Sequence, residues 1–415
     1  MHFKRFAGFA AIPALSMMST LLLLPLISSR FGADGWTSVA LGQSIGAILG
    51  VFVGLGWPVV GSHMVAAGGP SERQIIFAES LKTRVYALLI TSPIGVALCY
   101  FLAGSYVETA ILFVAAISLN GLTAAWYFAG TGEPGKLLRN EALVRVAGYG
   151  ISILLISLGA GLWSYGLCTL AAGVVMSVMN YGSIIGWRRS AVWRRTRSLR
   201  TLARDHIVGG MSRFVASSSM YSGTVIVAWI APAALPLYSA IDQVQKSVVN
   251  ATNSFPQAML SWVGSSKNRT TLLNRVKTSY RIAVLIGVVL FSAWSVLGVW
   301  IVEKLFSGKV DVPITLNLLS AALIAAIALS QAVASLVLVP LGIHRVVYSA
   351  TVAAALIGIT GRIVGTYFFE SAGAIGGLLL SYVLLLAIYA VAYRRRRRVL
   401  LQSPHGEDDL MAARW

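Results

Sequence analysis

The sequence contains little charge and few acidic residues. Charged residues make up 11% of the 415 positions, and Asp and Glu together number only 14, whereas soluble domains carry about 25% charged residues. The two cysteines, Cys99 and Cys168, lack metal-ligand spacing and are too few for a disulfide framework. These shortages argue against a soluble globular domain and against a disulfide-rich secreted one.

Enzyme signatures are also missing. No HExxH zinc motif, Walker A phosphate loop, GxSxG elbow or DxD carboxylate cluster occurs in the sequence. We therefore expect no enzyme activity, no cofactor and no metal site. Without a Walker A motif, the energy for any transport must come from an ion gradient, the membrane potential or consumption of the cargo on the far side.

Long apolar runs make up most of the chain. Apolar residues account for 57% of the positions, and about 20 consecutive apolar residues suffice to span a membrane as a helix. We predict an all-α polytopic membrane protein with about twelve transmembrane helices in two six-helix bundles. The predicted spans are 6–28, 38–60, 85–103, 108–129, 143–162, 164–186, 207–230, 235–262, 281–302, 314–340, 346–369 and 372–393.

An arginine-rich stretch separates the two predicted bundles. We expect an N-terminal bundle in 1–186, a cytoplasmic basic linker in 187–206 and a C-terminal bundle in 207–393. A basic, disordered cytoplasmic tail is expected in 394–415.

The net charge of +19 is concentrated on one side of this topology. Nearly every Lys and Arg falls at a terminus or in an even-numbered connection, which is the positive-inside pattern of a multi-pass protein with both termini in the cytoplasm. The excess charge thus reflects topology and attraction to anionic lipid, not binding to nucleic acid. The exceptions are Arg30, Lys304 and Lys309 at outer ends, and Arg213, Lys246 and Arg362 inside spans.

Tryptophans at span ends predict interfacial belts. The outer belt is expected to contain Trp36, Trp163, Trp229 and Trp300. The inner belt is expected to contain Trp57, Trp126, Trp187 and Trp262.

Span 235–262 is the least apolar of the twelve. Its polar residues fall within an arc of about 80° at 100° per residue, and ionisable groups at this depth usually face water or a pathway. We predict that they line a hydrated cavity. Two alternatives stay open, a polar seam bonded to neighbouring helices and a local ion pair between Asp242 and Lys246. The arc consists of Ser239, Asp242, Lys246, Asn250, Asn253 and Gln257.

Two further cations lie inside predicted spans, Arg213 near an inner end and Arg362 nearer an outer end. Either side chain could snorkel to the adjacent interface. With Lys246 they would form a graded set suited to an anionic substrate such as a phosphate or pyrophosphate. The predicted substrate-binding residues are Arg213, Lys246, Arg362, Asn250, Asn253 and Gln257, with Asp242 as the charge-pairing or ion-coupling residue.

Span 38–60 has a face of small residues. Gly42, Gly46, Gly50 and Gly54 recur every four positions, a spacing that predicts close packing against another helix.

Three segments resemble the polysaccharide flippases of the Wzx type. Ser29–Trp36 is similar to their R-x-x-G-x-x-G/W turn after the first helix. Leu237–Ala240, followed by Lys246 and Pro256, is similar to Y-Y-S-x-A…K…P, with Leu237 in place of the first tyrosine. The stretch similar to W-[YF]-F-x-G…R-N…R consists of Trp126–Glu133, Leu138, Arg139, Asn140 and Arg145.

This resemblance implies the multidrug/oligosaccharidyl-lipid/polysaccharide exporter superfamily, with a V-shaped pair of bundles around a cationic lumen. Such proteins move a polyprenyl-diphosphate-linked oligosaccharide to the outer leaflet of the bacterial plasma membrane, for O-antigen or exopolysaccharide synthesis. The implied partners are this lipid-linked substrate, membrane lipids and a polysaccharide polymerase. We expect a monomer.

Other functions stay open. An ion-coupled drug antiporter of the same superfamily would use intramembrane carboxylates, and only Asp242 lies deep in a predicted span. A major-facilitator transporter would carry a basic motif after its second span, which 62–82 lacks. A membrane-embedded polysaccharide polymerase or glycosyltransferase is less favoured, because no sizeable external loop or acidic sugar-nucleotide site is present.

Overall fold

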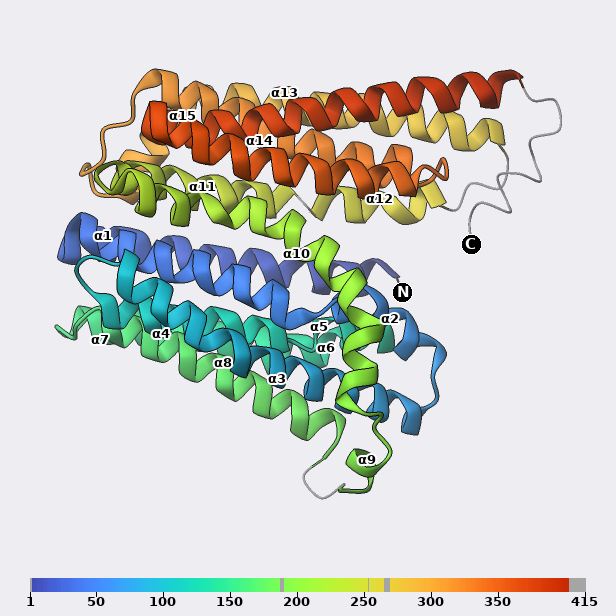
Figure 1. The fold of residues 1–415 in the computed structure, drawn as a ribbon, viewed down its shortest axis with the longest axis horizontal. Helices are drawn as coiled ribbons and strands as arrows, with labels where there is room; N and C mark the ends of the chain where they lie inside the picture. Colours follow the sequence, from blue (N-terminus) through green and yellow to red (C-terminus); the bar gives the residue numbers. More distant parts are fainter. Residues whose placement is uncertain (1, 187–189, 253, 265–268, 403–415) are drawn as a thin grey trace. The chain divides into compact units, whose positions relative to one another are not determined.

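The computed structural model describes residues 2–186, 190–252, 254–264 and 269–402 of the chain. These residues form helices and connecting turns without any strand (Figure 1). Eight of the described helices are long and apolar enough to cross a membrane. The predicted all-α, polytopic membrane fold is therefore confirmed.

Two long helices each cover all or most of two predicted spans. Helix α1 (His2–Gly54) bends at Gly32, whose φ of 65° is left-handed; glycine adopts this conformation without a Cβ penalty. Helix α15 (His344–Gln402) breaks at Phe369 and Glu370. The other predicted spans overlap with α3 (Pro70–Leu102), α4 and α5 (Val107–Ser118, Ala125–Thr131), α6 and α7 (Pro134–Leu137, Leu143–Ser157), α8 (Trp163–Ile184), α10 (Leu199–Ile230), α11 and α12 (Leu235–Thr252, Ser254–Gly264), α13 (Arg269–Leu305) and α14 (Ile314–Val333), although their bounds differ from the predicted ones.

The chain divides into two compact units. The N-terminal unit comprises Met1–Ala240 with Leu305–Lys309, and the C-terminal unit comprises Ile241–Lys304 with Val310–Trp415. Helix α10 packs against α1 and α3 within the N-terminal unit. The division at 187–206 expected from the arginine-rich stretch stays a prediction.

Helix α1 contacts α4 through its glycines. A Cβ on Gly42 would lie 2.4 Å from the Ala110 carbonyl oxygen, and one on Gly46 would lie 2.8 Å from Ile117 Cβ. Only glycine permits such a close approach of two helices. The predicted small-residue packing face is confirmed at these positions. Helix α4 in turn packs against α8, and α8 packs against α7.

The predicted tryptophan belts are wrong at three positions. Trp36, Trp57 and Trp126 are 3%, 0% and 4% exposed, so they belong to the interior and not to the interface. Trp57 and Trp126 join an aromatic core with Phe77, between α3, α5 and the helix α2 (Trp57–Ala67). Exposed tryptophans at span ends are Trp163, Trp229, Trp262 and Trp300.

The core of the C-terminal unit lies among α13, α14 and α15. The two halves of α15 approach each other at glycines, since a Cβ on Gly365 would lie 2.4 Å from the Gly373 carbonyl oxygen. The outer faces are apolar, as contact with lipid requires. Exposed residues of this kind are Leu285, Val288, Val289, Val296 and Leu297 on α13, and Leu89, Ile90, Ile94, Tyr100 and Phe101 on α3 of the N-terminal unit.

Part of the predicted basic linker is helical. A short helix, α9, spans Ser190–Arg194, and α10 begins at Leu199 with Ser198 as its N-cap. Helix α15 likewise continues through Arg394–Arg398, at the start of the predicted tail.

Candidate functional site

The polar arc of α11 contains a buried ion pair. Lys246 Nζ lies 2.5 Å from Asp242 Oδ2, with side-chain exposures of 13% and 7%. The two residues are one helical turn apart, so their side chains meet on one face. The sequence alternative of a local ion pair is confirmed, and the pair leaves α11 with little net charge at this depth.

Exposure of the arc increases along α11. Asp242 is buried, Lys246 is partly buried and Asn250 is exposed. Beside the arc, Ser320 Oγ of α14 donates to Gln245 Oε1 at 3.1 Å. The buried part of the helix therefore bonds to its neighbour within the C-terminal unit, and the later part leaves Asn250 accessible to water.

Three predicted site residues cannot be placed as side chains. Asn253 lies outside the described residues. Arg213 in α10 and Gln257 in α12 lie in described helices, but their side chains lie outside the described part of the structure. Their role as substrate ligands stays a prediction.

Arg362 is buried deep in the C-terminal unit. Its side chain is 1% exposed, so it does not snorkel to an interface. Among the described residues, Nε and Nη1 have no hydrogen-bond partner, and neither has Thr366 Oγ1 one turn later. The guanidinium lies near enough to Lys246 and Tyr382 for its charge to act on both. Within the described part of the chain, Arg362 is thus a buried cation whose Nε and Nη1 lack a bonded anion.

The N-terminal unit holds a second buried arginine, which sequence reasoning assigned to a cytoplasmic connection. Arg84 of α3 is 0% exposed. Its Nη1 donates to the carbonyl oxygens of Gly121 and Thr123 at 3.0 and 2.9 Å. Its Nε and Nη2 donate to Ser80, and the guanidinium lies 5.6 Å from the centroid of the Trp126 ring. The helix is interrupted between α4 and α5 by a 3-10 turn, Leu119–Leu122. The carbonyl oxygens of Gly121 and Thr123 are therefore free to accept from Arg84.

A buried carboxylate lies beside this arginine. Glu141 is 5% exposed and accepts hydrogen bonds from Ala124 N and Asn180 Nδ2, both at 2.8 Å, and from Thr123 Oγ1 at 2.5 Å. Its charge also acts on Arg84. A π-helical turn, Leu138–Ala142, precedes α7 at this point; such turns are often found at functional sites.

One sequence expectation, the boundary of a predicted span, is wrong at this place. Glu141 and Glu79 are buried, although both lie outside the predicted spans. The apolar helix that contains Glu141 begins at Pro134 and ends at Ser157, whereas the predicted span was 143–162. The signal in the sequence was the group of polar residues directly before the apolar run. The hydropathy criterion placed the start of the predicted span after them, so Glu141 was left out.

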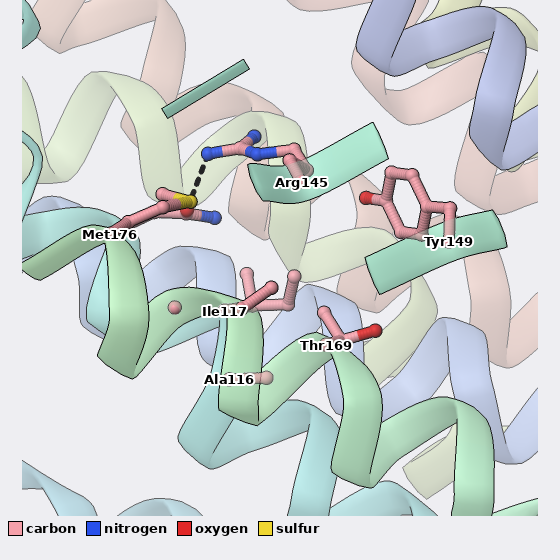
Figure 2. Close-up of a pocket in the computed structure, with 9 residues that line it drawn as sticks. Ala116, Ile117, Arg145, Tyr149, Thr169 and Met176 are labelled. Carbon is pink, nitrogen blue, oxygen red and sulfur yellow. Dashed lines mark hydrogen bonds between the residues drawn. The ribbon is translucent and has the colours of Figure 1, made fainter. Parts of the chain in front are cut away.

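A small cavity lies in the N-terminal unit between α4, α7 and α8 (Figure 2). Arg145 Nη2 donates to Asn120 Oδ1 at 3.0 Å at its edge, and Tyr149 and Thr169 also line it. Its volume of about 20 Å³ is enough for roughly one water molecule. This cavity does not accommodate an organic substrate.

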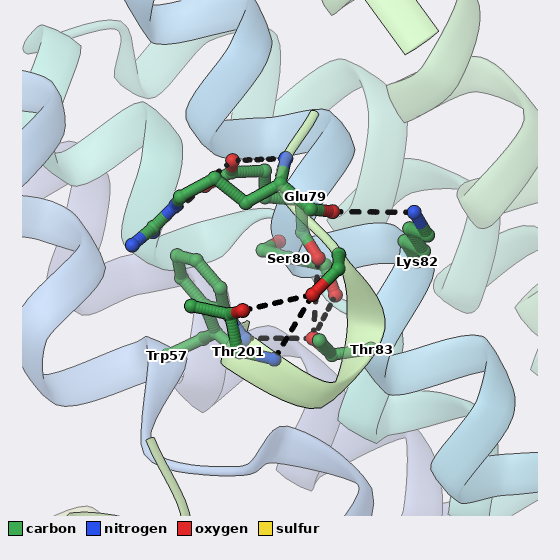
Figure 3. A network of polar contacts seen from close by, with 8 residues as sticks. Trp57, Glu79, Ser80, Lys82, Thr83 and Thr201 are labelled. Carbon is green, nitrogen blue, oxygen red and sulfur yellow. Dashed lines mark hydrogen bonds and ion pairs between the residues drawn. The ribbon is translucent and has the colours of Figure 1, made fainter. Parts of the chain in front are cut away.

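In the N-terminal unit, a polar network joins α3 to Arg197, which lies between α9 and α10 (Figure 3). Glu79 accepts from the backbone N and Nε of Arg197 and forms an ion pair with Nη2 at 2.9 Å. Lys82 Nζ donates to the Arg197 carbonyl oxygen, and Trp57 Nε1 donates to Thr83. The network fixes the chain just before α10.

Comparison with solved structures identifies the fold. A multidrug resistance MATE family transporter of the MOP superfamily, in an inward-facing conformation, matches with a TM-score of 0.69 at 15% identity, over 96% of this chain and 99% of that one. This chain has the MATE fold. A eukaryotic MATE transporter matches with 0.58 at 14% identity, over 99% and 98% of the two chains. The MATE multidrug transporter DinF-BH, solved as a complex, matches with 0.58 at 15% identity, over 96% and 97%.

These identities establish the fold alone. No protein-family model matches the chain, and no curated protein matches it either. The first of these structures is described as a member of the MOP superfamily, which is the superfamily that the sequence resemblance implied. For this chain, the resemblance to Wzx-type flippases stays a prediction.

Proposed function

We propose that this chain is a membrane transporter that works by alternating access. The observation that supports the proposal most strongly is the MATE fold, which extends over nearly the whole chain. The Asp242–Lys246 pair gives the fold a buried ionisable site, and ionisable groups placed inside a membrane usually serve transport.

The fold favours an ion-coupled small-molecule antiporter as the activity. Two of the solved structures described above are multidrug transporters by name. Buried carboxylates, which such coupling needs to exchange protons or sodium, are present at Asp242 and Glu141. In this mechanism, protonation or ion binding at Asp242 releases Lys246 from the pair. A cationic cargo and the coupling ion would then compete for the carboxylate of Asp242.

The charges favour a second candidate, a flippase for a polyprenyl-diphosphate-linked oligosaccharide. In the C-terminal unit, the partly exposed Lys246 and the buried Arg362 outnumber Asp242. A diphosphate is the type of group that such cations bind. The three flippase-like segments of the sequence agree with this cargo. The bacterial inner membrane as the location, and a polysaccharide polymerase as partner, belong to the same candidate.

One set of variants separates the two activities. Asp242→Asn, Lys246→Ala and Lys309→Ala are each measured for abundance in the membrane, for dye efflux driven by an imposed ion gradient, and for surface glycan in cells lacking their own flippase. Lys309 is the matched control, because its side chain bonds only to the carbonyl oxygens of Ser28 and Ser29 among the contacts described.

The antiporter predicts gradient-driven efflux that Asp242→Asn removes. The flippase predicts glycan export that Lys246→Ala removes, with a modest defect in Asp242→Asn. A wild-type protein that supports neither efflux nor glycan export would contradict the proposal that it is a transporter of either class.

A further inference from the structure

Arg362 and Thr366 form a group of unsatisfied donors inside the C-terminal unit. Both residues lie on α15, four positions apart, so their side chains are neighbours on one helix face, with Cβ atoms about 5–6 Å apart. Arg362 is 1% exposed and Thr366 is also 1% exposed. Arg362 Nε and Nη1 and Thr366 Oγ1 have no partner among the described residues.

The surrounding structure explains why no described side chain bonds to them. Gly361 and Gly365, which directly precede the two residues, bring the halves of α15 into backbone contact at Gly377 and Gly373. The close approach of the two halves buries Arg362 and Thr366 almost completely, at 1% exposure each. Asp242, the acid on α11, is already bonded to Lys246 at 2.5 Å.

The charge at this place requires a counter-ion. Water molecules could satisfy the donors of Arg362, but they would not neutralise a guanidinium in a low-dielectric interior. The charge of Arg362 acts on Lys246, but Lys246 is already paired with Asp242. A bound anion would therefore stabilise Arg362 directly and would reduce its repulsion of Lys246.

We propose that the C-terminal unit holds a small inorganic anion, of the chloride type, bound by Arg362 Nε and Nη1 and by Thr366 Oγ1. The near-complete burial of both residues favours a monatomic ion over a bulky phosphate ester. The anion belongs to the resting protein and does not depend on which cargo is carried. By reducing repulsion at Lys246, it also couples halide concentration to the Asp242–Lys246 pair, and such coupling is reciprocal.

The test measures anion-dependent stability of the full-length protein in lipid nanodiscs. Thermal unfolding is followed at constant ionic strength while gluconate is replaced by chloride, by bromide or by inorganic phosphate. Chloride and bromide should raise the Tm of the wild type in a saturable manner. Bromide should in addition give an anomalous scattering peak beside Arg362 in crystals.

Four variants make the assignment specific. Arg362→Gln should abolish the halide-dependent rise in Tm, and Thr366→Val should raise the apparent Kd for chloride several-fold. Arg362→Lys keeps the charge and should retain a weakened response, which preserves the test if Arg362→Gln does not accumulate. Arg30→Gln is the control, because Arg30 donates to the carbonyl oxygens of Ile156 and Ser157 in the other unit, and its halide response should equal that of the wild type.

Two outcomes would overturn the proposal. A wild-type Tm that is indifferent to halide, or that responds equally in Arg362→Gln, would leave water as the partner of Arg362. A response to inorganic phosphate without one to chloride or bromide would assign these donors to a phosphate group instead.

Discussion

Arg84 and Arg362 are both completely buried arginines, one in each unit, but their surroundings differ. Arg84 donates to Ser80, Gly121 and Thr123 and has the carboxylate of Glu141 near by. Arg362 has no bonded acceptor at Nε or Nη1 in the part of the chain that the structure describes. A buried charge that is fully bonded holds its neighbours in place, whereas one that is not bonded is available for a ligand. The comparison therefore indicates a structural role for Arg84 and a ligand-binding role for Arg362.

The most direct test of this difference removes the charge of each arginine in turn. Arg84→Gln leaves two carbonyl oxygens and the Glu141 carboxylate without their cation, so we expect a loss of about 3–5 kcal/mol in the free energy of unfolding. Arg362→Gln, measured in a halide-free buffer, should change it by less than about 1 kcal/mol or increase it, because an uncompensated charge is removed. Unfolding in nanodiscs measures both. Equal losses would show that Arg362 is structural as well.

Substitution of Lys246 should affect transport more than stability. Lys246→Ala should abolish transport while leaving enough protein in the membrane to assay, and Lys246→Arg should retain part of the activity, because the charge is kept and the donor geometry changes. The stability loss should be smaller than for Arg84→Gln, because Lys246 is partly exposed. Transport rates are divided by the amount of protein in the membrane. Full activity at normal abundance would exclude Lys246 as a cargo contact.

Glu79 tests a partly exposed pair in the N-terminal unit. The Arg197 side chain is 45% exposed, although Glu79 is only 5% exposed. Because solvent screens such pairs, Glu79→Gln should reduce the free energy of unfolding by only about 1 kcal/mol and should increase proteolysis of the linker before α10. High salt should reduce the difference between the variant and the wild type. A loss as large as that of Arg84→Gln would contradict this ranking.

The smallest effect is expected from Glu133, between the two apolar helices Val107–Thr131 and Pro134–Ser157. Partial burial alone would raise the pKa of its carboxyl, but hydrogen bonds from Lys136 and Thr131 outweigh this and lower the pKa below 4.5. A carboxyl with a lowered folded-state pKa stabilises the protein above its unfolded pKa, and this contribution disappears as pH falls through the folded pKa. Below about pH 4.5, Glu133→Gln should therefore approach the wild type in Tm. A difference that grows on acidification would refute this assignment.

The ion pair on α11 was foreseeable because its determinant is local. Asp242 and Lys246 are four residues apart, and helical geometry alone brings their side chains together. Arg362 is recognisable as an intramembrane cation because it lies inside a long apolar run, which is also a local property of the sequence. Arg84 was not, because it lies at the edge of an apolar run, where hydropathy cannot distinguish a solvated arginine from one buried against Trp126.

The sequence by itself determined that the chain forms long apolar helices and which glycines of α1 pack closely against another helix, because hydropathy and residue size act along a single helix. Only the tertiary structure decided which buried charges have partners on segments distant in the sequence. The carbonyl oxygens that bind Arg84 come from a break in a different helix, and the backbone contact that isolates Arg362 comes from the return half of α15. Hydrogen bonding between segments distant in sequence depends on how those segments pack, and no local pattern of residues encodes it.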